Sequence, residues 1–310
     1  MTGQVIPGTR PAVMAGRVSG PPRRRLRHSP WLYVAPALIL LITFTYVPVG
    51  NMLFYSFHKW DGLDVTMDPA GLDNYVRVFT DERYWRVFLI SLYYFIASFA
   101  QIAIALYFAV ILSFNTRFRN LFKGILFFPY LLNGVAVGFV FLYLFQPDGT
   151  LDTVLRLIGL GEHTRLWLGD PDIANLSLAG TSVWRFTGLN FVLFLGAIQS
   201  IPGEIYEAAE IDGANRWHQF RHIIAPGIRR IISLSFILAI SGSLAVFEIP
   251  FIMTGGANGT RTFVVQAYET AFQFRQIGLA SAMAVVLLLI VLVMTWVQRR
   301  LLPDEEVNLS

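Results

Sequence analysis

The sequence predicts an all-α polytopic membrane protein with six transmembrane helices. Of its 310 residues, 55% are hydrophobic and only 14% are charged. The mean hydropathy is +0.55, and a soluble protein of this size needs more charge to cover its surface. The apolar residues also gather into six runs, each longer than the roughly 20 residues that cross a bilayer. These observations exclude an ordinary soluble domain.

Polar segments bound the six apolar runs. The second run contains no charged residue, the third includes Pro129, the fourth contains Arg185 and the fifth contains Glu248. The connections at 58–85 and 147–175 are polar, the latter acidic and rich in glycine. The predicted spans are 31–57, 87–112, 124–145, 173–200, 231–254 and 277–297.

The two ends of the chain differ from the rest in composition. Residues 1–30 are rich in Gly, Pro and Arg, which predicts a disordered basic tail at the membrane surface. The apolar run that follows is too long for a signal peptide and lacks a small-residue cleavage site. We therefore expect a transmembrane domain over 31–301, with its core at about 87–300, and a second short tail at 302–310.

Basic residues predict the orientation. With the N-terminus inside, cytoplasmic segments hold 15 of the 24 Lys and Arg residues and outer segments hold 8. This positive-inside bias places both termini and the segment 201–230 in the cytoplasm. The pI near 9.4 follows from arginines beside apolar runs, so it indicates membrane orientation rather than nucleic-acid binding.

A polar segment between the fourth and fifth spans, 203–226, reads as two short amphipathic helices joined at Gly213. Gly213 permits a backbone turn that a side chain would penalise. Pro226 is expected to limit further helix. The first helix carries an apolar stripe of Ile205, Ala208, Ala209 and Ile211, and the second a stripe of Trp217, Phe220 and Ile224. A hairpin too short to fold alone, beside a membrane, is typical of a docking surface.

The same residues carry a family resemblance. Glu207-Ala208-Ala209, then Asp212-Gly213-Ala214, a following Phe220 and Ile223-x-x-Pro226 resemble the EAA loop of ABC-importer permeases, most closely those for carbohydrate uptake. The resemblance implies a type I ABC importer permease fold in a bacterial inner membrane. It also implies four kinds of partner: a second permease, two ATP-binding subunits, an extracytoplasmic solute-binding protein and a sugar-like solute.

By this resemblance, the hairpin is the segment that a separate ATPase grips. Glu207 would accept a charge-assisted contact from a basic residue of that subunit. We expect Trp217 and Phe220 also to pack the second helix against the cytoplasmic ends of the spans. The expected coupling residues are Glu207, Ala208, Ala209, Asp212, Gly213, Ala214, Trp217 and Phe220.

ATP chemistry is not expected in this chain. A phosphate-binding P-loop needs Gly-Lys-Ser/Thr, and neither Lys59 nor Lys123 follows a glycine. ATP and magnesium are therefore expected on the partner ATPase, with no cofactor bound here and no enzymatic activity. His218 and His222 have the spacing of a helical metal pair, but Gln219 cannot serve as a zinc-protease base, so no metal site is expected.

Two charges within the spans mark a candidate solute pathway. A charge in hydrocarbon is costly and usually faces a cavity or a partner. Arg185 and Glu248 would either form a pair that ties two helices together or line the path of a polyhydroxylated solute. Neighbouring polar and aromatic groups would complete such a path. The candidate pathway residues are Arg185, Trp184, Asn190, Glu248, Tyr143 and Asn133.

Two other classes of protein are weighed against an ABC permease. An ion-coupled secondary transporter would favour acidic residues near mid-membrane, and Glu248 alone supports it thinly. An intramembrane enzyme is disfavoured because the sequence lacks Gly-x-Ser-x-Gly, His-Glu-x-x-His and embedded Asp pairs. The sequence does not distinguish among saccharides, polyols and glycerol phosphates as the solute.

Overall fold

The computed structural model describes residues 30–114 and 118–301. The predicted tails thus fall outside the described residues, apart from position 30. The described chain is mainly helical and divides between Pro48 and Val49 into two units. Each unit is considered by itself.

The first unit holds most of the predicted first span. Helix α1 (Pro30–Leu41) runs through a π-helical segment, η1 (Ile42–Tyr46), into α2 (Val47–Ser56). Pro48 has no N–H to donate to the preceding turn, and its ring would crowd the carbonyl four residues back. A widened turn relieves this crowding, which accounts for the π-helix just before Pro48.

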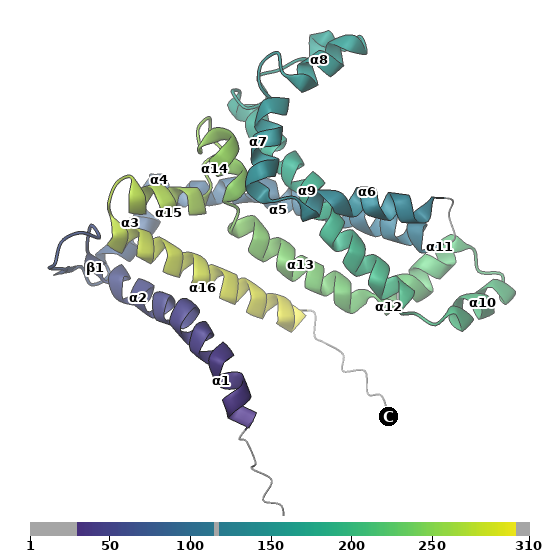
Figure 1. The fold of residues 1–310 in the computed structure, drawn as a ribbon, viewed down its shortest axis with the longest axis horizontal. Helices are drawn as coiled ribbons and strands as arrows, with labels where there is room; N and C mark the ends of the chain where they lie inside the picture. Colours follow the sequence, from purple (N-terminus) through teal and green to yellow (C-terminus); the bar gives the residue numbers. More distant parts are fainter. Residues whose placement is uncertain (1–29, 115–117, 302–310) are drawn as a thin grey trace, which may run out of the picture. The chain divides into compact units, whose positions relative to one another are not determined.

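The second unit is a helical bundle with a small two-stranded sheet (Figure 1). β1 and β2 pair in an antiparallel register, with His58 opposite Pro69. The elements are β1 (His58–Lys59), β2 (Asp68–Pro69), α3 (Asp73–Thr80), α4 (Glu82–Trp85), α5 (Val87–Ser113), α6 (Arg119–Leu131), α7 (Gly134–Leu144), α8 (Thr150–Leu157), η2 (Gly161–His163), α9 (Pro171–Gln199), α10 (Gly203–Ile211), α11 (Arg216–Gln219), η3 (Phe220–Ile224), α12 (Ala225–Gly227), α13 (Arg229–Leu244), α14 (Glu248–Thr254), α15 (Phe263–Phe272) and α16 (Ile277–Leu301).

The number of apolar helical stretches agrees with the predicted number of spans. Two of the predicted spans, the third and the fifth, are interrupted. Within the described residues, five helical stretches are long and apolar enough to cross a membrane, and a bent pair, α6 and α7, makes a sixth candidate. The predicted third span, with Pro129 and Asn133 inside it, is not one straight helix, because α6 and α7 meet at 98°. The fifth span is interrupted as well, between α13 and α14.

Local capping explains the break in the third span. Leu132 has an extended backbone, and the Asn133 side chain accepts a hydrogen bond of 2.9 Å from the backbone N–H of Val135. An asparagine in this N-cap position starts a new helix and satisfies one of its free donors. Asn133 therefore begins α7 instead of lying inside a continuous span.

The polar connections contain more structure than the sequence indicated. The segment predicted as an acidic linker at 147–175 includes α8 and η2. Its buried Asp152 accepts hydrogen bonds from the Trp167 indole at 2.7 Å and from the backbone N–H of Asp148 at 3.0 Å. A buried carboxylate satisfied in this way stabilises a fold that composition alone reads as a loop.

The β1–β2 connection and the hairpin of α10 and α11 lie at opposite ends of the second unit. β1, α3 and α15 lie at one end of the bundle and α10 lies at the other (Figure 1). Between them, α5 and α9 form the most extensive helix pair. A core cluster that includes Ile102, Phe191 and Phe194 joins this pair. The separation of the two ends is what the predicted topology requires.

The α6–α9 contact depends on a glycine. A Cβ added at Gly188 of α9 would lie 2.6 Å from the carbonyl oxygen of Leu126 and 3.1 Å from the Cα of Phe127. Small residues let helix backbones approach closely in membranes. By contrast, an added Cβ at Gly180 of the same helix would meet nothing within 4 Å.

We expect Gly188→Ala to destabilise the protein by about 1–3 kcal/mol, because α6 and α9 must move apart. Gly180→Ala, the matched control, should be neutral or slightly stabilising, since alanine is the better helix former. Thermal unfolding in detergent compares the two variants. Equal Tm values for both would show that close backbone packing at Gly188 does not matter.

Candidate functional site

An ion pair joins α9 to the interrupted fifth span. The Arg185 guanidinium donates to the Glu248 carboxylate at 2.8 Å. Glu248 is the first residue of α14, directly after the break in the fifth span. A Cβ added at Gly134, the first residue of α7, would collide with both charged side chains. The pair therefore lies against the start of α7 and within the break between α13 and α14.

The Arg185 guanidinium contacts a carboxylate and an aromatic ring, but its Nε–H group has no hydrogen-bond partner in the described part of the chain. Its guanidinium also lies 4.9 Å from the centre of the Phe186 ring, a cation–π contact. Its Nε is buried and has no hydrogen-bond partner among the described residues. The Nε–H group is therefore left without an acceptor within the described structure. The Arg185 side chain is largely buried, whereas the Glu248 side chain is half-exposed. Loss of Glu248 would therefore leave a mostly buried cation without its counter-charge.

A cavity of about 640 Å³ opens beside this pair. Polar groups from three spans line it: Tyr94, Ser98 and Gln101 from α5, Ser182, Arg185 and Asn190 from α9, and Ser243 and Glu248 from α13 and α14 of the fifth span. Its remaining lining is largely apolar, with Phe186, Phe247 and several aliphatic side chains. Its volume lies in the range of small-molecule sites.

Two buried polar atoms in the cavity lack a partner in the described structure. They are the Tyr94 hydroxyl and the Asn190 amide oxygen, on residues that are 3% and 5% exposed. Buried polar groups are almost always hydrogen-bonded, so each such exception asks for an explanation. Together with the Nε of Arg185, they are unpaired polar atoms beside a largely apolar cavity. This arrangement suits a neutral molecule rich in hydroxyl groups.

The structure brings together three of the predicted pathway residues. Arg185, Asn190 and Glu248 all line the cavity. Tyr143 is exposed, and Trp184 packs against Phe141 with 5.1 Å between ring centres. Asn133 caps α7 rather than lining the cavity. The pathway roles of all six residues stay predictions.

Sequence reasoning missed the contribution of the second span. Tyr94, Ser98 and Gln101 recur at intervals of four and three residues, so they share one face of α5. From the sequence, this span was distinguished only by its lack of charged residues. A polar stripe at helical spacing in an otherwise apolar run was the signal that could have revealed this face.

The hairpin between α9 and α13 forms as two short helices, as predicted. Helix α10 ends at Ile211, and Gly213 has a φ of +78°, in the left-handed region. The N–H of Ala214 donates to the carbonyl of Ala209 at 2.8 Å, which closes the end of α10. Asn215 then caps α11 by accepting from the backbone N–H of His218 at 2.9 Å.

The expectation that Pro226 limits the second helix needs correction. The chain continues helically through η3 and α12 to Gly227, and the break comes at Ile228. Pro226 follows the π-helical segment η3, and that widened turn accommodates the proline ring within the helical run, as it does before Pro48. The hairpin therefore runs almost directly into α13.

One side of the hairpin is anchored in the bundle. Tyr206, Phe220 and Ile224 pack in the cluster that also holds Phe194 and Ile198 of α9. Burial raises the pKa of Tyr206 above its usual value, and its buried hydroxyl has no partner among the described residues. The hairpin is thus held through its aromatic side chains.

The other side of the hairpin is exposed in the described structure. No residue of α10 is buried, Ile211 is 87% exposed and Trp217 is 63% exposed. The prediction that Trp217 packs against the spans is therefore wrong, although Phe220 does. The Trp217 ring lies over Phe220, with 5.5 Å between ring centres. Exposed apolar residues beside Glu204, Glu207 and Glu210 make a surface suited to a protein partner.

The two histidines of the hairpin do not form a metal site with other residues. Their ring centres are 6.2 Å apart, and the Nδ1 of His222 lies 3.1 Å from the carbonyl oxygen of His218. Over residues 30–114 and 118–301, no group of three or more His, Cys, Asp or Glu side chains could hold a metal ion.

Comparison with known proteins agrees with this geometry. Residues 101–306 match the model of the family described as binding-protein-dependent transport system inner membrane component. The chain is 32% identical to the probable ABC transporter permease protein YurN of Bacillus subtilis, over 87% of this chain and 94% of that protein. It is 31% identical to the multiple sugar-binding transport system permease protein MsmF of Streptococcus mutans, over 89% and 96%.

A solved structure shows the same fold. The crystal structure of a bacterial alginate ABC transporter, in complex with a periplasmic protein bound to an alginate pentasaccharide, contains a chain that matches with a TM-score of 0.77. The identity is 20%, and the match covers 87% of this chain and 92% of that chain. These matches favour an ABC importer over an ion-coupled secondary transporter. The protein belongs to the binding-protein-dependent transport system inner membrane components, the multi-pass permease subunits of ABC importers.

Proposed function

We propose that this chain forms half of the translocation path of an importer for a sugar or a sugar-like solute. A second, homologous permease would supply the other half, and two ATP-binding subunits would drive the pair. An extracytoplasmic binding protein would deliver the solute. The names of relatives such as MsmF support a sugar-type solute.

The observation that carries this proposal is the exposed surface of the α10–α11 hairpin. It presents apolar and acidic side chains on one side and is anchored through Tyr206 and Phe220 on the other. Glu207, Ala208, Ala209, Asp212, Gly213 and Ala214 lie on this hairpin, together with the exposed Trp217. A subunit that grips this surface would move the ends of α9 and α13.

ATP and magnesium would be bound by the separate ATPase, because this sequence has no P-loop. The chain itself would bind no cofactor and perform no covalent chemistry. In a bacterial cell membrane, the hairpin and both termini would face the cytoplasm. The bias of Lys and Arg toward the same side as the hairpin supports this orientation.

The cavity beside Arg185 and Glu248 supplies the solute contacts in this proposal. The Tyr94 hydroxyl and the Asn190 amide would hydrogen-bond sugar hydroxyl groups, while Phe247 and Phe186 offer aromatic faces. The ion pair would serve both as a tie between helices and as a polar wall. Movement of the hairpin would open this cavity alternately to each side of the membrane.

The coupling role of the hairpin predicts a graded effect at Gly213. Gly213→Val should lower ATP-driven uptake roughly tenfold, because a left-handed conformation costs a β-branched residue at least about 1–2 kcal/mol. Gly213→Asn should keep more activity, since asparagine tolerates this region. Nothing lies within 4 Å of an added Cβ, so a clash would not explain the loss.

Uptake of labelled solute is measured in proteoliposomes that hold the whole transporter. Wild-type uptake should require ATP and persist when ionophores collapse proton and sodium gradients. Gly203→Val is the matched control, because Gly203 opens α10 with open space around it and without a left-handed φ. Uptake that follows an ion gradient, or normal ATP-driven uptake in Gly213→Val, would contradict the proposal.

The Tyr94 hydroxyl provides a test of the solute path. Tyr94→Phe removes only a group without a protein partner, so stability should not fall. The KM for uptake should rise about two- to tenfold, the value of one hydrogen bond. Tyr107→Phe, at an exposed position of the same helix, should leave KM unchanged. An unchanged KM in Tyr94→Phe would remove this residue from the path.

Two amide substitutions separate the roles of the ion pair. Glu248→Gln leaves Arg185 without a counter-charge and should destabilise the protein by about 1.5–3 kcal/mol. Adding Arg185→Gln should restore protein yield. If the double variant also regains the wild-type KM, the pair only ties the helices. A KM that stays raised after yield recovers shows that these charges contact the solute.

A further inference from the structure

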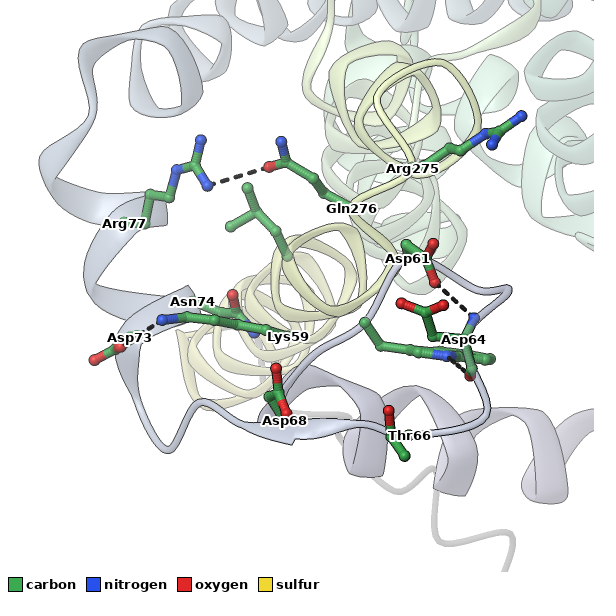
Figure 2. A pocket seen from close by; sticks show the side chains of 12 residues that line it. Lys59, Asp61, Asp64, Thr66, Asp68, Asp73, Asn74, Arg77, Arg275 and Gln276 are labelled. Carbon is green, nitrogen blue, oxygen red and sulfur yellow. Dashed lines mark hydrogen bonds and ion pairs between the residues drawn. The ribbon is translucent and has the colours of Figure 1, made fainter.

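A second recess lies at the end of the bundle opposite the hairpin. Its volume is about 590 Å³, and it is formed by the β1–β2 connection, α3 and the turn before α16 (Figure 2). With the hairpin in the cytoplasm, this end faces outward. The recess is separate from the cavity beside Arg185, with which it shares no lining residue.

Most of the cations around the recess are already engaged. The Lys59 ammonium lies 3.3 Å from the Asp73 carboxylate, and Arg77 donates to the Gln276 amide oxygen at 3.1 Å. Arg275 lies at the rim and extends away from the aspartates (Figure 2). Outside the Lys59–Asp73 pair, three carboxylates face two guanidinium groups, so the recess carries a net negative charge.

Three of the four aspartates in the recess have no ion pair within the described structure, and two of these also have no hydrogen bond to their carboxylates. The Asp61 carboxylate accepts hydrogen bonds from the backbone N–H groups of Asp64 and Leu63, each at 2.9 Å, and these bonds lower its pKa. The carboxylates of Asp64 and Asp68 have neither an ion pair nor a hydrogen bond within the described structure. Both residues are exposed, so their negative charge reaches an approaching partner.

A buried acceptor lines the same recess. Asn74 is 6% exposed, and its amide nitrogen donates to the carbonyls of Ser56 and His58 at 2.9 and 3.0 Å. Its amide oxygen has no hydrogen-bond partner among the described residues. Asn74 lies beside Lys59 in the wall of the recess (Figure 2). The free groups are thus an amide oxygen and two carboxylates, and all of them accept hydrogen bonds.

The loop over the recess carries an apolar tip. Leu63 is exposed, and Val65, between the two free aspartates, is 99% exposed. Such a tip could enter a membrane, but the flanking carboxylates would then face anionic lipid headgroups. Apolar side chains ringed by charge are instead typical of a protein interface, with an apolar centre and a polar rim.

We propose that the β1–β2 loop and its recess dock a basic patch on the extracytoplasmic binding protein. Lysine or arginine side chains of that protein would meet Asp64, Asp68 and the Asn74 amide oxygen, while Leu63 and Val65 fill an apolar hollow between them. This inference rests on the proposed function, because it assumes a binding-protein partner. The carboxylates act mainly on the rate of association, and the apolar tip acts on the lifetime of the complex.

The test uses the whole transporter in lipid nanodiscs and its purified, solute-loaded binding protein. The double variant Asp64→Asn/Asp68→Asn should associate about three- to tenfold more slowly at low ionic strength, with little change in dissociation. The difference should shrink as salt is raised. Leu63→Ser/Val65→Ser should instead raise the dissociation rate severalfold.

The matched control is Glu162→Gln, which removes an exposed outer carboxylate outside the recess and should leave both rates unchanged. Equal association rates for wild type and the double aspartate variant at low salt would overturn the inference. Loss of the second permease from the purified variants would overturn it as well, by assigning the surface to that subunit. Failure of any binding protein to dock on the wild type would instead contradict the proposed function.

Discussion

The need to satisfy a charge inside the membrane organises the second unit. Arg185 cannot remain unpaired among apolar helices, and its partner Glu248 lies on a different span. The pair requires a gap in the fifth span and a residue without a side chain at Gly134. Both breaks thus meet at one ion pair. The cavity opens beside it because interrupted helices do not pack as closely as continuous ones.

Helix α9 connects this region to the hairpin. Its middle carries Arg185 and Asn190, and its last turns carry Phe194 and Ile198, which pack with Tyr206 and Phe220. The hairpin continues helically into α13, whose far end borders the Glu248 break. A displacement of the hairpin would therefore act on two of the helices that line the cavity. This contiguous packing is the physical basis of the coupling in the proposed function.

Composition and short-range pattern predicted much of the fold. The cost of exposing backbone groups in hydrocarbon leaves helices as the natural solution for long apolar runs, so six spans follow from hydropathy. The two amphipathic stripes and Gly213 predicted a hairpin, and its left-handed φ agrees. Arg185 and Glu248 could be identified from the sequence because charged residues are rare within membrane spans. This identification did not require the positions of their helices.

The sequence by itself thus determined the number and type of the spans, the hairpin and the two charges that need a partner. Only the tertiary structure decided where the third and fifth spans break, because capping by Asn133 competes with an apolar run that otherwise favours one helix. It also decided that Tyr94 faces Arg185 and Asn190, and that Trp217 and Val65 stay exposed. These outcomes depend on which helix faces pack together, and single-sequence periodicity identifies a face without naming its neighbour.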